Sequence, residues 1–265
     1  LFYIPSNLMG NIIVTGATGA IGSAAVRRLQ EFGHNVIGTS RRTEHEGFYP
    51  LDISSPKSIT AFVERLHDEG LRIDGLLNNA GTISRRFQTT AEGFELVTAT
   101  NYLGTYLLTR RLLPLMNVGA NIVCTASLSC YAAHIDRDFF NVSEDNYRQI
   151  KAYSNSKLAL VYFAQELHRR YGEGLHINLT DPGIVNSRMI HLERWYDDLA
   201  DLIFRPLTKS PEKGAVPAVN ALTTDCRIQL FRGSRHGDIP RGWQDAKAAS
   251  WLWDETERRL AGWLR

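Results

Sequence analysis

Two residues four positions apart could carry proton-transfer chemistry in this sequence. Tyr153 and Lys157 lie at the start of a long helical pattern, and residues four apart on a helix share a face. A phenol normally titrates near ~10, and a neighbouring ammonium stabilises its phenolate. The pair could therefore exchange a proton with a substrate near neutral pH. Alone, this spacing more often marks a half-buried tyrosine beside a solvated lysine. Whether the pair is catalytic therefore depends on the motifs in the rest of the chain.

A glycine-rich turn near the N-terminus indicates nucleotide binding. The apolar run 11–15 predicts a buried parallel strand, and apolar residues of 24–29 follow in helical register. The segment 15–22 between them contains three glycines. Small residues let the backbone approach a pyrophosphate, and the helix N-terminus supplies N–H donors and partial positive charge. The alternative is a plain tight turn between a strand and a helix.

Basic residues after the second predicted strand favour NADP(H). The strand is predicted at 34–39, and Ser40, Arg41 and Arg42 follow it. An NAD site usually has an acid here for the ribose 2′-hydroxyl, whereas arginine suits a 2′-phosphate. The first acid, Glu44, comes later. The alternative is a pair of solvated loop arginines.

The rest of the chain alternates strands and helices. Strands are predicted at 48–51, 73–77, 121–125, 176–179 and 228–232, and helices at 54–69, 91–116, 152–171 and 211–224. This alternation predicts an α/β fold of the Rossmann type: a doubly wound, mostly parallel sheet of about seven strands with helices on both faces. Polar or small residues follow the strands at Asp52, Asn78–Gly81, Ser127 and Asp181–Gly183, where open α/β sheets bind ligands.

Composition excludes several classes of function. The 265 residues fit one domain, and 43% hydrophobic residues support a large core. Lys and Arg number 30 against 28 for Asp and Glu, so no strong field draws nucleic acid or an anionic membrane. The three cysteines lack metal-ligand spacing, which indicates a reducing compartment. No apolar run approaches the ~18 residues of a membrane anchor, and we expect a cytoplasmic protein.

Three segments lie outside the alternating pattern of this single predicted domain, 1–265. Residues 128–150 are polar and aromatic, long for a connection, and predicted to cover the substrate side. Residues 184–208 are also rich in aromatic side chains and are predicted to form a substrate loop. Residues 244–265 form an amphipathic pattern that predicts a helix packed onto the body.

Taken together, the motifs resemble the short-chain dehydrogenase/reductases over residues 10–264. The matching marks are Thr15-Gly16, Gly19, Gly22, Asp52, Asn78-Asn79-Ala80-Gly81, Asn101, Ser127, Tyr153 with Lys157, and Pro182-Gly183. Each mark is weak alone, and their order at the predicted strand ends makes the set specific. The 26-residue step from Ser127 to Tyr153 and the run Ala152–Ala159 are similar to the retinol dehydrogenase, WW-domain oxidoreductase and protochlorophyllide reductase branch.

The resemblance implies a catalytic tetrad of Asn101, Ser127, Tyr153 and Lys157. Tyr153 would donate or accept the substrate proton, and Ser127 would hydrogen-bond the substrate oxygen. Lys157 and the positive charge of the nicotinamide would together lower the tyrosine pKa, and Lys157 would also hold the nicotinamide ribose. Asn101 would position a water that links Lys157 to solvent. The implied NADP(H) contacts are Gly16, Thr18, Gly19, Ala20, Ile21, Ser40, Arg41, Arg42, Asp52, Ile53, Asn79, Ala80, Gly81, Tyr153, Lys157, Pro182, Gly183 and Val185. No metal site is expected.

The leading hypothesis is an NADP(H)-dependent oxidoreductase that reduces a lipophilic aldehyde or ketone. A second is a nucleotide-sugar epimerase or dehydratase, because the Gly16/Gly19/Gly22 spacing is that of the extended epimerase branch. A third is a non-catalytic protein that senses NADP(H). The expected partner is a small-molecule carbonyl or alcohol, with no nucleic acid. Pairing into a homodimer is left open.

Overall fold

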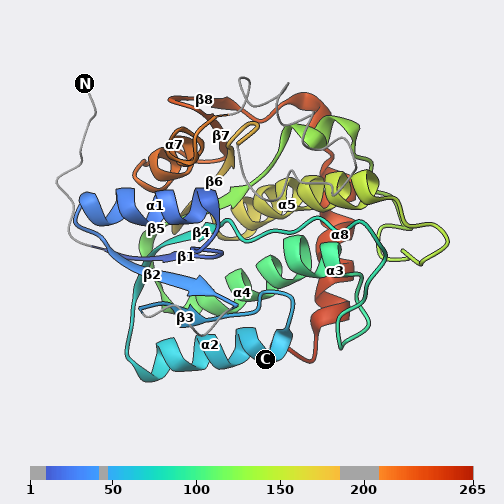
Figure 1. Ribbon diagram of the computed structural model, residues 1–265, viewed down its shortest axis with the longest axis horizontal. Coiled ribbons are helices and arrows are strands. Elements are labelled where there is room, and N and C mark those ends of the chain that lie inside the picture. Colours follow the sequence, from blue (N-terminus) through green and yellow to red (C-terminus); the bar gives the residue numbers. More distant parts are fainter. Residues whose placement is uncertain (1–9, 42–46, 186–208, 265) are drawn as a thin grey trace.

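One eight-stranded β-sheet organises the protein (Figure 1). The structure is a computed structural model that describes residues 10–41, 47–185 and 209–264. Its strands are β1 (Asn11–Val14), β2 (Asn35–Ser40), β3 (Tyr49–Pro50), β4 (Ile73–Asn78), β5 (Met116–Thr125), β6 (Leu175–Asp181), β7 (Gln229–Arg232) and β8 (Arg235–Asp238). Their order in space is β3-β2-β1-β4-β5-β6-β7-β8. Neighbours are parallel except for the β7–β8 pair. The strand order reverses between β1 and β4, where α/β sheets bind ligands.

The mostly parallel α/β class is confirmed, and the sheet has one strand more than expected. The additional strand, β8, turns back from β7 through Gly233, whose φ is +58°. All four of its residues are exposed. A strand at the sheet edge without a buried face carries no alternation of apolar and polar residues, so the sequence pattern missed it.

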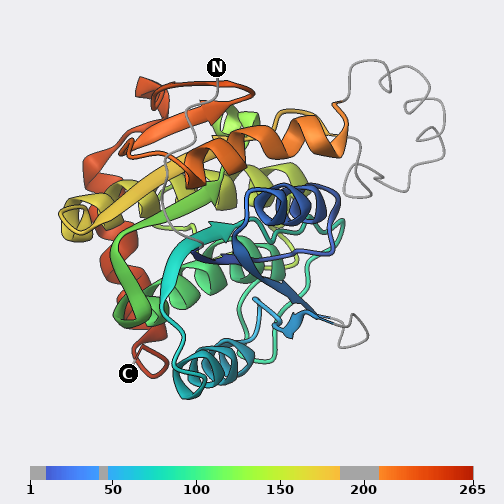
Figure 2. The ribbon, with the colours of Figure 1, turned by 90° about the vertical axis from the view of Figure 1, so that its left-hand side faces the viewer.

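Helices cover both faces of the sheet (Figures 1 and 2). The main helices are α1 (Ala20–Glu31), α2 (Pro56–Asp68), α4 (Gly104–Leu112), α5 (Gln149–Tyr171) and α7 (Pro211–Leu222). The core follows the alternation of side chains along each strand: Val14 lies in the cluster with α1 and α7, and Ile13 lies in the cluster with α2, α4 and α5. The carboxyl ends of the strands lie between the two helix layers, where open α/β sheets bind ligands.

The helix predicted at 91–116 is wrong at both ends. A turn at Gly93, with φ +82°, precedes α3 (Leu96–Thr98). The Glu95 carboxylate caps α3 by accepting the N–H groups of Val97 and Thr98 at 2.8 and 2.7 Å. The path continues through a π-helical turn η1 (Ala99–Leu103), α4 and a 3₁₀ turn η2 (Leu113–Leu115). Strand β5 then begins at Met116, because that residue pairs with Ile73 in β4.

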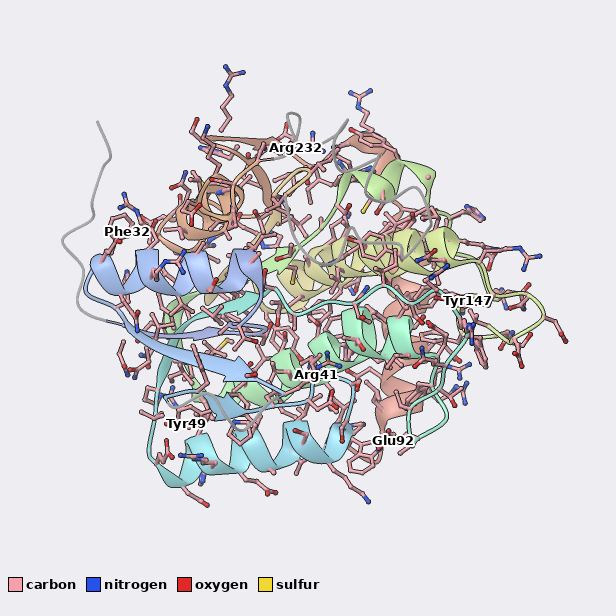
Figure 3. All side chains as sticks on the ribbon, in the orientation of Figure 1. Phe32, Arg41, Tyr49, Glu92, Tyr147 and Arg232 are labelled. Atoms are coloured by element: carbon pink, nitrogen blue, oxygen red, sulfur yellow. The ribbon has the colours of Figure 1, made fainter. Side chains whose placement is uncertain are left out.

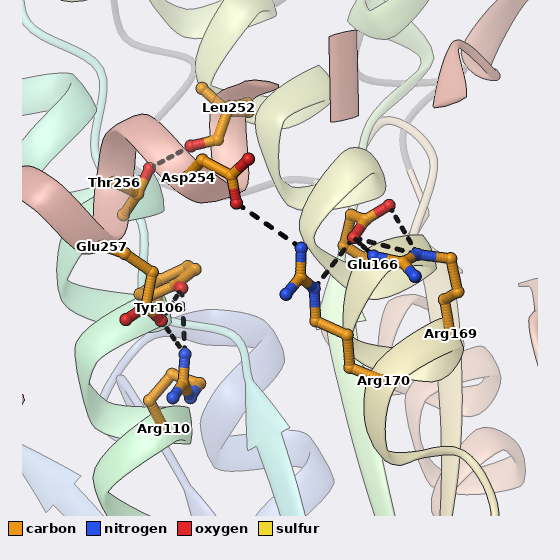
Figure 4. A network of polar contacts seen from close by, with 9 residues as sticks. All are labelled: Tyr106, Arg110, Glu166, Arg169, Arg170, Leu252, Asp254, Thr256 and Glu257. Carbon is orange, nitrogen blue, oxygen red and sulfur yellow. Dashed lines mark hydrogen bonds and ion pairs between the residues drawn. The ribbon is translucent and has the colours of Figure 1, made fainter. Parts of the chain in front are cut away.

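The C-terminal pattern forms α8 (Ala246–Leu260), which follows a short 3₁₀ turn η6 (Arg241–Trp243). Helix α8 packs on α4 and α5 through polar contacts shown in Figure 4. Glu257 accepts from Tyr106 and pairs with Arg110, while Asp254 lies 3.5 Å from Arg170. The Trp253 ring stacks on a phenylalanine of α5 at 5.9 Å between centroids. The outward face of α5 is thus covered by the chain's own C-terminal helix.

The predicted substrate-side segment, 128–150, starts with a 3₁₀ turn η3 (Leu128–Ala132) and joins α5 at Gln149, earlier than the predicted 152. Its aromatic residues serve packing: Phe139 is buried against Tyr102, and the Tyr147 hydroxyl donates to the Ser84 carbonyl at 2.6 Å. These two contacts anchor the segment to the π-helical turn η1 and to the loop after β4, and its covering of the substrate side stays a prediction. The predicted substrate loop from 186 to 208 and Arg42 lie outside the described residues.

Candidate active site

Three of the predicted catalytic residues meet where β5 ends beside α5. Tyr153 and Lys157 project from the same face of α5, with the Lys157 Nζ 5.8 Å from the centre of the tyrosine ring. The Ser127 side chain lies close enough to the Tyr153 phenol to counter part of the rise in the pKa of Tyr153. Lys157 is only 4% exposed, and its Nζ donates to the Thr125 carbonyl at 2.9 Å. The structure thus places a phenol and a serine hydroxyl side by side over a buried ammonium.

The electrostatics of this group differ from the expectation. Burial raises the pKa of Tyr153, and the hydrogen bond from Ser127 opposes that shift. Burial also lowers the pKa of Lys157 to about 8. The sequence predicts that Lys157 lowers the tyrosine pKa; in the structure desolvation dominates, because both groups lie in a low-dielectric interior. A further positive charge beside the phenol would be needed to bring it into the range of proton exchange.

Asn101 fastens the loop after β4 to α5. It lies in the π-helical turn η1, a distortion frequent at functional sites. Its fully buried amide accepts the Thr82 N–H at 2.7 Å and donates to the Thr82 carbonyl and the Ser156 hydroxyl, both at 2.9 Å. Ser156 in turn donates to the Tyr153 carbonyl at 2.7 Å. The amide therefore holds the framework of the site, and the water-positioning role stays a prediction.

The glycine turn leaves the N-terminus of α1 accessible. Gly16 has φ +65°, a conformation that favours glycine. A Cβ at Gly22 would lie 2.2 Å from the Gly16 carbonyl oxygen, so only glycine fits there. Gly19 occupies the N-cap position, and no side chain of the described residues caps the helix. Uncapped N–H groups at a helix N-terminus suit a diphosphate. The predicted contacts Thr18, Ala20 and Ile21 lie at this turn and in the first turn of α1.

Thr15 is a site residue that the sequence analysis used only as part of a motif. Its hydroxyl accepts the N–H groups of Asn79 and Ala80, each at 2.9 Å. It also donates to the Leu77 carbonyl at 3.2 Å, and the Asn79 amide returns a bond to the Thr15 carbonyl at 2.9 Å. These bonds tie the glycine turn to the Asn79–Gly81 segment. The sequence signal that could have predicted this role is the hydroxyl of Thr15 directly before the first glycine of the turn, Gly16.

The residues predicted for the adenosine end lie at the ends of β2 and β3. Ser40 is 4% exposed, and Arg41, labelled in Figure 3, follows it with an exposed side chain. The Asp52 carboxylate accepts from the backbone and hydroxyl of Ser54 at 3.0 and 2.7 Å. Ile53 is buried in the core. A guanidinium and a polar strand end thus border the place expected for the adenosine ribose.

The predicted nicotinamide side is a turn after β6. Gly183 has φ +73°, and its N–H donates to the Asp181 carboxylate at 3.0 Å. Lys209 Nζ donates to the Pro182 carbonyl at 3.3 Å. Val185 is buried and forms a parallel bridge with Lys209. The described residues therefore fit a dinucleotide that runs along the carboxyl ends of β1, β4, β5 and β6.

Comparison with known proteins decides the family. A family model described as short chain dehydrogenase matches residues 10–195. The chain belongs to the short-chain dehydrogenase family. Human retinol dehydrogenase 13 is 34% identical over 275 residues, covering 93% of this chain and 83% of the relative. Mouse polyprenol dehydrogenase is 32% identical over 236 residues, covering 79% of this chain and 70% of the relative. The resemblance to the retinol dehydrogenase branch is confirmed.

Solved structures support the fold of this dehydrogenase. An uncharacterised protein of Mycobacterium paratuberculosis aligns with a TM-score of 0.77 and 26% identity, covering 98% of this chain and 96% of that protein. A protein of Beutenbergia cavernae described as an NAD(P)-dependent gluconate 5-dehydrogenase, with NADP bound at low occupancy, aligns at a TM-score of 0.63 and 24% identity, covering 84% of this chain and 94% of that protein. The protein is therefore an oxidoreductase that acts on alcohols or carbonyls. Neither the epimerase nor the sensing hypothesis is favoured by these comparisons.

Proposed function

We propose that this dehydrogenase uses NADP(H) to interconvert a lipophilic alcohol and its aldehyde or ketone, and that it works as a reductase. The observation that carries the proposal is the placement of the Tyr153 phenol beside Ser127, on the same face of α5 as the buried Lys157. A phenol and a serine hydroxyl that lie side by side can both donate a hydrogen bond to a single substrate oxygen. One catalytic domain over the whole chain agrees with the single sheet.

The residues would divide the proton chemistry among them. NADPH supplies the hydride when bound, and its oxidised nicotinamide adds positive charge near the phenol. Tyr153 donates its proton to the carbonyl oxygen during reduction, and Ser127 holds that oxygen and stabilises its developing charge. Lys157 stands below the phenol with an ammonium able to hold the nicotinamide ribose. Asn101 keeps α5 in register with the loop after β4.

Apolar side chains around the site support a lipophilic substrate. Leu128, Tyr131 and Ile184 are 47%, 62% and 56% exposed. Leu128 directly follows Ser127, and Ile184 directly follows the Pro182–Gly183 turn. Exposed apolar side chains next to residues of a site can contact an apolar ligand there. The names of the two relatives, retinol and polyprenol dehydrogenase, denote long apolar alcohols, which agrees with this surface.

Arg41 supports the choice of NADP(H). It follows β2 without an acid at the strand end, and its exposed guanidinium can bind a 2′-phosphate bidentately. Two further properties belong to the proposal. The cysteine content favours a cytoplasmic location. Helix α8 covers the outward face of α5, so a homodimer would have to use another surface. No helix within the described ranges has the length and apolar character to cross a bilayer.

The test is NADPH consumption with a panel of carbonyls: octanal, decanal, retinal, a methyl ketone and glucose. We expect turnover of the long-chain aldehydes and little of the sugar. Tyr153→Phe should reduce kcat by roughly 10²–10⁴, the typical contribution of acid–base catalysis, and should keep NADPH binding. Tyr171→Phe, at the far end of the same helix, is the matched control and should retain activity.

Three results would contradict the proposal. Full turnover by the Tyr153→Phe variant would show that another group supplies the proton. NADPH binding without hydride transfer to any carbonyl would support the sensing hypothesis. Conversion of a nucleotide sugar without net consumption of the cofactor would support the epimerase hypothesis.

A further inference from the structure

A buried carboxylate, Asp181, pairs with the half-exposed Arg232 beside the candidate active site, and this pair has no part in the mechanism above. Asp181 ends β6, and its register partner Arg232 ends β7. Register partners on neighbouring strands project to the same face of a sheet. The Arg232 Nε lies 3.3 Å from the Asp181 Oδ2, and the carboxylate side chain is only 4% exposed. A buried carboxylate needs such a partner because desolvation penalises its charge.

The pair also fixes the turn that the cofactor is expected to touch. The other carboxylate oxygen of Asp181 accepts the Gly183 N–H at 3.0 Å. Arg232, labelled in Figure 3, packs against the fully buried Trp243, and its guanidinium carbon lies 5.3 Å from the centre of the indole ring. The Asp181 carboxylate thus links the end of β7, through Arg232, to the turn at Gly183.

The charge of Asp181 reaches the proton-transfer pair. After burial, which is the largest cause, it contributes to the raised pKa of Tyr153, and it opposes the lowering of the pKa of Lys157 by burial. A negative charge near a phenol disfavours the phenolate. The Lys157 ammonium of α5 lies 5.8 Å from the centre of the Tyr153 ring, and Ser127, Cys130 of η3 and Asp181 of β6 act on the pKa of the phenol. Asp181 is near because the preceding residue, Thr180, accepts the N–H of Ala126, which directly precedes Ser127, at 2.8 Å. Arg232 of β7 acts on this set through Asp181.

We propose that Asp181 and Arg232 form a positioning unit that holds the Gly183 turn and sets the local charge beside Tyr153, with Arg232 as the neutralising partner. The inference rests on the proposed function, since it assigns proton transfer to Tyr153. It adds two residues that neither touch the substrate oxygen nor belong to the predicted tetrad. With Arg232 in place, the phenol faces a compensated pair; without it, the phenol faces a bare carboxylate.

The decisive measurement is kcat/KM for oxidation as a function of pH, with NADP⁺ and the alcohol of the fastest aldehyde in the panel. Oxidation requires the phenolate, so the rate rises as Tyr153 ionises. Asp181→Asn removes the negative charge and keeps an acceptor for the Gly183 N–H. The pH at which kcat/KM rises should therefore be lower than in the parent by roughly 0.5–1 pH unit. Arg232→Met leaves the Asp181 carboxylate without its positive partner, so the pH at which kcat/KM rises should be higher than in the parent by about as much.

Two further variants separate charge from packing. Arg232→Lys keeps the positive charge and should stay near the parent profile. The double variant Asp181→Asn/Arg232→Met removes both charges and should also return toward the parent. A loss of melting temperature with an unmoved pH profile in every variant would overturn the proposal, because a purely structural ion pair predicts that result. Shifts in the same direction for both single variants would overturn it too. If Arg232→Met does not fold, Asp181→Asn alone decides.

A binding readout tests the turn without any chemistry. Asp181→Ala removes the acceptor of the Gly183 N–H and should weaken NADPH binding in a fluorescence titration, whereas Asp181→Asn should keep it. Equal NADPH affinity in the two variants would overturn the positioning of the turn. Failure of the proposed function can be told apart from failure of this inference, because in the first case Tyr153→Phe would retain turnover. If Tyr153→Phe is inactive and the profiles do not move, only the ion-pair inference fails.

Discussion

Adding one methyl group at Gly22 tests whether the glycine turn is built for a dinucleotide. In Gly22→Ala the new Cβ would lie 2.2 Å from the Gly16 carbonyl oxygen and 2.9 Å from the Asn79 amide nitrogen. Contacts below 3.0 Å are essentially never seen for real Cβ atoms. The turn and the helix must therefore separate by about 0.8 Å. Backbone has to move, since the nearest atom is a main-chain oxygen.

The magnitude follows from two opposing effects. Alanine favours a helix over glycine by up to about 1 kcal/mol. Overpacking costs about 1–3 kcal/mol, and the upper part of that range applies to a clash with backbone. We expect a net loss of about 1–2 kcal/mol, which lowers the melting temperature by roughly 2–8 °C in a chain of this size.

NADPH binding should suffer more than stability. The displaced Gly16 carbonyl carries the turn away from the first N–H groups of α1, so we expect at least a tenfold weaker Kd, equal to about 1.4 kcal/mol. The assays are fluorescence titration of NADPH and thermal unfolding with and without cofactor. Saturating NADPH should then raise the melting temperature of the variant less than that of the parent.

Gly174→Ala is the matched control, since a Cβ there meets open space. It should change stability by less than about 0.5 kcal/mol and leave NADPH binding unaltered. The reasoning would be refuted if Gly22→Ala bound NADPH and melted like the parent. Equal weakening by both substitutions would show that the effect does not come from the contact with Gly16.

Three other predictions concern the cofactor, the framework and pH. The parent should prefer NADPH to NADH by roughly ten- to several-hundred-fold in kcat/KM, as one or two charge-assisted hydrogen bonds allow. Arg41→Asp should invert that ratio, and parity in the parent would refute the assignment. Asn101→Ala should lower the unfolding free energy by about 2–5 kcal/mol in urea titrations, because both backbone groups of Thr82 lose their partner. Burial lowers the pKa of His168 and His176, so the folded protein keeps them neutral while the unfolded chain protonates near pH ~6.5. Stability should fall as pH drops below about 6.5, and a His168→Gln/His176→Gln variant should lose less between pH 7 and 5.5; an equal loss would exclude both residues as the cause.

The sequence alone determined the fold class, the family and the chemical groups at each strand end. The reason is local. A turn such as Thr15–Gly22 constrains its own residue types, because only glycine fits its φ angles and close contacts. Tyr153 and Lys157 share a face by helix geometry alone. Their shared face could therefore be predicted before any long-range contact was known, and the structure adds Ser127 beside them. The catalytic roles of the four residues stay a prediction.

Tertiary structure decided what depends on segments far apart in the chain. Strand β8 and the π-helical turn around Asn101 carry no sequence period of their own, so only their pairing and packing define them. The pKa of Tyr153 depends on burial, which the spacing of Tyr153 and Lys157 does not contain. The Asp181–Arg232 pair joins residues brought together by strand register. Residue types reveal which groups are present, and the environment that packing creates around them sets their charge and their neighbours.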